Sequence, residues 1–122
     1  MKNFIALLVL LGCCAALNAQ TTARRKSGPD CSGGWPTQMA FVKLKNAGLA
    51  DANSVDLSKT KTERLASQPT ETGVWRQVYL VTFAKKSGGS IVVIAMHDAS
   101  EEECSLTDVD VYVVSQHLSA KK

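Results

Sequence analysis

The sequence lacks the short motifs that mark most enzymes. A nucleophile elbow of the G-x-S-x-G type is absent. Of the two "SGG" stretches, residues 32–34 follow no predicted strand and residues 87–89 suit a hairpin, so neither predicts a phosphate-binding loop. The paired carboxylates of a glycosidase need a cleft, which a chain of 122 residues has little mass to build. We therefore expect no enzyme and no catalytic residues.

Metal-binding motifs are also missing. The sequence has only two histidines, His97 and His117, and zinc sites need several histidines or thiolates. The acidic stretch "HDASEEECSLTD", residues 97–108, has neither the alternating acids nor the central glycine of a calcium loop. His97 and Asp98 are the weak candidates for a metal ligand, and we expect neither a metal nor another cofactor.

Long apolar runs are missing beyond the first residues. The run "FIALLVLLG", residues 4–12, follows Lys2 and falls far short of the ~20 residues that cross a bilayer. A positive residue, a short apolar run and then small residues up to Ala19 are typical of a secretory signal peptide. We predict cleavage after Ala19, a periplasmic or secreted protein, and no transmembrane segment.

A second processing event competes with this one. The stretch "LLGC" ending at Cys13 resembles the lipobox of bacterial lipoproteins, in which the cysteine carries the lipid anchor. Signal-peptide cleavage would leave Cys31 and Cys104, an even pair in an oxidising compartment, whereas cleavage before Cys13 would leave Cys14 as an odd thiol. We expect a Cys31–Cys104 disulfide and keep the anchor at Cys13 as the alternative.

Charge of one sign does not dominate the chain, whose formal net charge is +3. The basic runs "RRK" and "KK", residues 24–26 and 121–122, lie near the two ends of the expected mature chain. Residues 30–118 hold eleven Asp and Glu against eight Lys and Arg. A nucleic-acid binder needs a basic face on its folded part, so we expect no nucleic-acid partner.

Hydrophobic patterning predicts one helix followed by four strands. Residues 35–49 carry apolar side chains at helical spacing, with Pro36 suited to the first turn and Gly48 to the position past the end. The stretches typical of strands are residues 55–67, 74–84, 91–96 and 108–118. Their short connections favour an antiparallel meander, so the sequence predicts an α+β fold with the helix packed on a four-stranded sheet.

The expected domain organisation follows from these elements. Residues 1–19 form the signal peptide, residues 20–34 a flexible lead-in, residues 35–118 a single α+β domain, and residues 119–122 a basic tail. This order of elements resembles that of cystatin-type folds. The "QxVxG" inhibitory loop of that family is absent, so the resemblance implies a fold and no activity.

The two middle strands, residues 74–84 and 91–96, are apolar on both faces, yet one helix covers only one face. Strong twist of the sheet and the flanking loops would cover the other face, or it is left for the lead-in, for a second subunit in a homodimer, or for a partner.

A small exported domain without catalytic chemistry suits an inhibitor or immunity protein that binds another protein. Trp35 and Trp75 are residues of the kind enriched at binding hot spots. The acidic residues Glu101, Glu102 and Glu103, held by Cys104, form a loop that could enter a basic or polar active-site cleft. We predict a non-enzymatic protein-binding protein, with a small-ligand or metal carrier as the alternative and a small hydrolase behind it.

Overall fold

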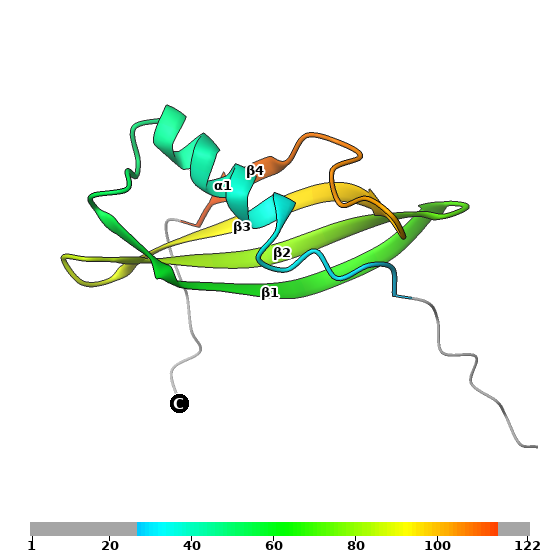
Figure 1. Cartoon of the computed structure of the whole chain (residues 1–122), viewed down its shortest axis with the longest axis horizontal. Helices are drawn as coiled ribbons and strands as arrows, with labels where there is room; N and C mark the ends of the chain where they lie inside the picture. The colour runs from blue at the N-terminus through cyan, green and yellow to red at the C-terminus, as the bar shows by residue number, and fades with distance from the viewer. Residues whose placement is uncertain (1–26, 115–122) are drawn as a thin grey trace, which may run out of the picture.

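The computed structural model describes residues 27–114 and has one helix lying on a four-stranded sheet (Figure 1). The elements are helix α1 (Trp35–Asn46) and the strands β1 (Val55–Glu71), β2 (Val74–Lys85), β3 (Ser90–Ser100) and β4 (Asp110–Val113). All neighbouring strands pair antiparallel in the order β1-β2-β3-β4. The predicted α+β fold, a helix followed by a meander, is confirmed.

Helix α1 begins and ends where its proline and glycine predict. Pro36 lies in the first turn, where no intrahelical partner is lost. After Asn46, the backbone N–H of Leu49 donates to the Leu44 carbonyl and that of Gly48 to Lys45. Gly48 has a φ of 70°, so these two bonds form the Schellman ending that favours glycine.

The core lies between α1 and one face of the sheet. Alternate residues of β2, among them Tyr79, Val81 and Phe83, are buried on this face, as the period of two predicts. Leu44 and Ala40 of α1 join the same cluster, and the rings of Phe41 and Phe83 have centroids 5.9 Å apart.

Strand β1 continues through Glu71, beyond the predicted end at residue 67. Pro69 is accommodated because β1 is an edge strand, where a missing N–H does not interrupt the sheet. Strand β3 also continues, to Ser100, so His97 and Asp98 lie within a strand instead of a loop. They pair with Gln77 and Arg76 of β2.

Several predictions concern parts of the chain outside the described residues. These are the signal peptide, the alternative anchor at Cys13, residues 20–26 of the lead-in, His117 and the basic tail. No helix in the described part is both long enough and apolar enough to cross a membrane.

Candidate functional site

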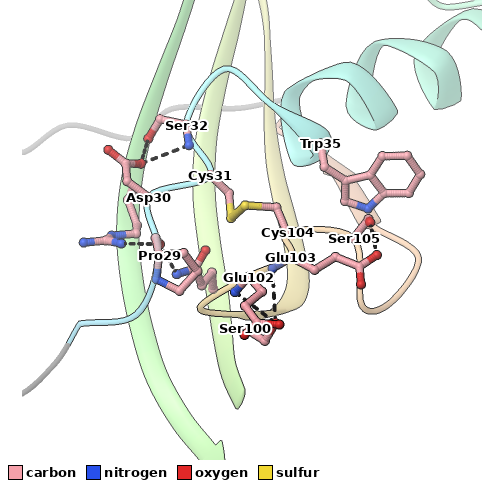
Figure 2. Close-up of a disulfide and its surroundings, with 12 residues drawn as sticks. Pro29, Asp30, Cys31, Ser32, Trp35, Ser100, Glu102, Glu103, Cys104 and Ser105 are labelled. Carbon is pink, nitrogen blue, oxygen red and sulfur yellow. Dashed lines mark hydrogen bonds between the residues drawn. A yellow bond between two sulfur atoms is a disulfide. The ribbon is translucent and has the colours of Figure 1, made fainter. Parts of the chain in front are cut away.

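The Cys31–Cys104 disulfide predicted from the sequence is present, with an S–S distance of 2.04 Å. It joins the segment just before α1 to the loop between β3 and β4 (Figure 2). The backbone N–H of Cys31 donates to the Tyr79 hydroxyl at 3.0 Å, and that hydroxyl donates to Gln77 Oε1 at 2.8 Å. The bridge is therefore attached to the buried centre of β2.

The loop that carries Cys104 begins with a tight turn. The Ser100 backbone N–H donates to the Glu103 carbonyl at 2.8 Å. The Ser100 hydroxyl oxygen accepts from the Glu103 N–H at 3.1 Å and from the Glu102 N–H at 3.4 Å. The Ser105 hydroxyl donates to Glu103 Oε1 at 2.6 Å. These bonds and the disulfide fix the backbone on which the acidic side chains are carried.

The far end of the loop is tied to the sheet and to α1. Thr107 accepts at its hydroxyl from the Asp98 N–H at 2.9 Å, and at its carbonyl from Trp35 Nε1 at 3.2 Å. Lys43 of α1 forms a 2.6 Å ion pair with Asp108. The hydrogen bonds from Lys43 and from the Val109 backbone lower the pKa of Asp108. The loop therefore has attachments along its whole length.

This loop and the adjacent Trp35 include most of the predicted partner-binding residues. Glu101, Glu102 and Glu103 are exposed and Leu106 is 41% exposed. Trp35 is half-buried beside the loop, where Figure 2 also shows Glu102 and Glu103. We call these five residues the loop surface. It combines an aromatic and an aliphatic side chain with an acidic rim.

Trp75 does not join the loop surface. Its side chain is only 7% exposed and lies under Gly28, where a Cβ atom would come within 2.7 Å of the indole. Gly28 also has a φ of 70°, so both the backbone conformation and the contact with Trp75 favour glycine at this position. Trp75 packs in the interior, so a partner could reach little of it.

His97 and Asp98, the weak metal candidates, point to opposite faces of the sheet because successive strand residues alternate. The Asp98 carboxylate forms two hydrogen bonds with Arg76, at 2.8 and 3.0 Å, which lower its pKa. In residues 27–114 no three His, Cys, Asp or Glu side chains lie together as a metal site would require. Because the two side chains lie on opposite faces of the sheet, His97 and Asp98 do not form a shared metal-binding site.

His97 is 2% exposed, with its ring centroid 5.8 Å from that of Tyr79. Neither ring nitrogen has a hydrogen bond within the described part of the chain. Burial lowers the pKa of His97 and outweighs the opposing influence of the nearby Cys104 backbone. The ring is therefore a neutral core residue at neutral pH.

A polar hollow of about 310 Å³ lies at the end of β3 near this loop. Two of its three carboxylates are already paired, Asp98 with Arg76 and Asp108 with Lys43. Of its acidic residues only Asp110 has no such described pair. This pairing favours a structural role for the hollow.

The second face of the sheet is uncovered by any described element (Figure 1). Its large apolar side chains, half-buried or exposed, include Val78, Leu80, Val92, Ile94, Met96 and Tyr112. The expectation that one helix leaves one apolar face open is met in the described part. Which molecule or segment covers that face remains a prediction.

A groove between α1 and β1 has no counterpart among the residues that the sequence singled out. It lies beside a shift in the pairing register of β1 between Asp56 and Lys61, and the "DLS" stretch, residues 56–58, is part of that irregular segment.

Comparison of the chain with protein-family models, with curated proteins and with solved structures finds no match.

Proposed function

We propose that this chain is a small exported protein without enzymatic activity, and that it binds another protein as an inhibitor or immunity protein does. The loop surface is its contact region. The partner region has a basic character that complements Glu101, Glu102 and Glu103.

The observation that carries this proposal is the combination of exposed carboxylates with a fixed backbone. The turn at Ser100 and the disulfide at Cys104 hold the chain on both sides of Glu102 and Glu103. A contact loop that is already ordered loses less conformational entropy on binding, which favours affinity. Trp35 beside the loop adds an aromatic group of the type enriched at hot spots.

The disulfide also supports export. Stable disulfides form in the periplasm and outside cells and are rare in the cytosol. Cys31 is buried in the core, and its disulfide links it to Cys104, which lies 73 positions later in the sequence. A bond at this position in the fold suits a protein that acts in an oxidising compartment.

The test compares three immobilised proteins in periplasmic extract, followed by quantitative mass spectrometry. They are the wild type, the loop variant Glu102→Lys/Glu103→Lys, and a control Glu63→Lys/Glu71→Lys. The control has the same change in net charge on exposed residues of β1. We expect a protein that the wild type and the control retain and the loop variant loses.

A second measurement tests the inhibitor role directly, with lysozyme, a basic cell-wall hydrolase, as the probe enzyme. The wild type and the control should slow its turnover, and raised salt should weaken the effect because screening reduces interactions between exposed charges. The proposal fails if no captured protein distinguishes the loop variant from the control and lysozyme is unaffected.

A further inference from the structure

Strand β1 departs from the regular sheet near its start. Asp56 pairs with Ala84 and Lys61 with Thr82, so residues 57–60 face a single residue of β2, Phe83. The Asp56 carboxylate accepts from the Ser58 N–H at 3.2 Å and from the Ser58 hydroxyl at 2.6 Å, which holds this bulge in place. Bulges of this kind are often found next to binding sites.

The bulge and α1 form the two walls of a groove of about 440 Å³, which is within the range of about 300–1,000 Å³ typical of small-molecule sites. Phe41 and Phe83 supply aromatic surface to it. Val42 and Leu57 also line it and remain 41% and 47% exposed. None of the described residues that line the groove is charged.

Three threonines supply the groove with hydroxyl groups. Thr37 of α1 and Thr62 of β1 hydrogen bond to one another at 2.8 Å. The Thr60 hydroxyl oxygen is buried and has no partner among the described residues. A buried hydroxyl without a partner is unfavourable, so its presence beside a groove needs an explanation. Thr60 is itself one of the residues that line the groove, so its unpaired hydroxyl belongs to the groove wall.

We infer that this groove is a binding site for a small uncharged molecule with an aliphatic body and one hydroxyl or carbonyl group. The apolar walls bind the aliphatic body, and the Thr60 hydroxyl bonds to the polar group. The lack of charged lining residues disfavours an ionised ligand, because a charge in an apolar site loses hydration without gaining a partner. None of the described residues that line this site belongs to the loop surface, and the inference does not depend on the proposed function.

The probes are 1-octanol, 2-octanone, octanoate and octylamine, which share the length of their carbon chain and differ in the head group. Each is titrated into the isotopically labelled full-length protein and followed by amide chemical shifts. We expect 1-octanol and 2-octanone to shift the amides of Phe41, Leu57 and Thr60, and the charged probes to bind at least about tenfold more weakly.

Two variants test the geometry. Thr60→Val keeps the shape of the side chain, removes the hydroxyl, and should weaken 1-octanol binding about five- to tenfold, the value of one hydrogen bond. Val42→Trp places a large ring at the exposed rim and should abolish binding. Thr60→Val also removes an unsatisfied group, so misfolding of this variant is not expected.

The inference is overturned by any of three results. In the first, octanoate or octylamine binds as well as 1-octanol. In the second, the shifts map to the open face at Leu80, Ile94 and Tyr112 instead of the groove. In the third, the free protein shows nuclear Overhauser contacts between Phe41 or Leu57 and a segment outside residues 27–114, which would mean that the chain itself fills the groove.

Discussion

At the scale of single residues, the described part has three buried side-chain polar atoms without a hydrogen-bond partner. They are Thr60 Oγ1 and both ring nitrogens of His97. Leaving such a group unpaired costs about 1–3 kcal/mol, so each position contributes unfavourably to folding. The other buried polar residues Thr37 and Gln77 are bonded. Substitutions that remove the unpaired polar atoms of Thr60 or His97 should therefore raise the free energy of unfolding.

The first prediction compares two threonines of the same strand. Thr60→Val should raise the free energy of unfolding by about 1 kcal/mol because it removes an unpaired hydroxyl. Thr62→Val should lower it by about 1 kcal/mol because Thr37 then loses its partner. Urea denaturation of both variants measures the difference. Equal effects of the same sign would contradict this description of the groove.

The second prediction concerns acid. Burial lowers the pKa of His97 below its usual 6.5, so between that folded value and 6.5 the unfolded chain binds more protons than the folded one. The His97 contribution to stability should therefore fall as the pH drops through about 6.5 and level off below the folded pKa of His97. A further fall at lower pH is expected from Asp98 and Asp108, whose pKa values are lowered in the folded state.

His97→Leu provides the comparison for this pH effect. Its free energy of unfolding should be higher than that of the wild type by about 1 kcal/mol near pH 7. Between about pH 7 and pH 5, the free energy of unfolding of the variant should depend less on pH than that of the wild type. Denaturation at several pH values measures both quantities. A wild type and variant with the same pH slope would show that another group titrates in this range.

At the scale of the elements, the disulfide connects the α1 segment to the β3–β4 loop. The chain-entropy model for a closed loop with a sequence separation of 73 residues gives about 4 kcal/mol of stabilisation. Cys31→Ala/Cys104→Ala should lower the free energy of unfolding by about this amount and speed amide exchange in residues 101–107. Unchanged exchange in the loop would mean that its hydrogen bonds alone hold it.

Much of the element order could be predicted from the sequence. Hydrophobic patterning predicted one helix followed by four strands, and Pro36 and Gly48 marked the ends of α1. These signals are local, because they depend on the period of two and on backbone preferences of single residues. The Cys31–Cys104 disulfide was predicted from the number of cysteines that remain after signal-peptide cleavage.

The parts that could not be predicted depend on contacts between distant segments. His97 belongs to a strand because β2 pairs with it, although its acidic neighbours resemble a loop. Trp75 is buried because Gly28 of the preceding segment lies over it. The bulge in β1 shows only when the register against β2 is known, so the groove was missed.

At the scale of the whole molecule, the expected export and the exposed acidic loop belong to one hypothesis. Mass spectrometry of the protein recovered from the periplasm tests the first part. We predict an N-terminus at Gln20 after cleavage of residues 1–19. An acylated N-terminal Cys13 would show instead that the protein is anchored to a membrane.

The most direct test of the binding hypothesis is the affinity of the captured partner, or of lysozyme, measured by calorimetry. Glu102→Lys/Glu103→Lys should weaken binding by about tenfold or more, because a charge reversal opposes a basic surface. The urea midpoint should fall only slightly, because the Ser105–Glu103 hydrogen bond that this variant removes is exposed. Glu63→Lys/Glu71→Lys should bind like the wild type. Equal affinities for the wild type and both variants would contradict the assignment of this loop as the contact surface.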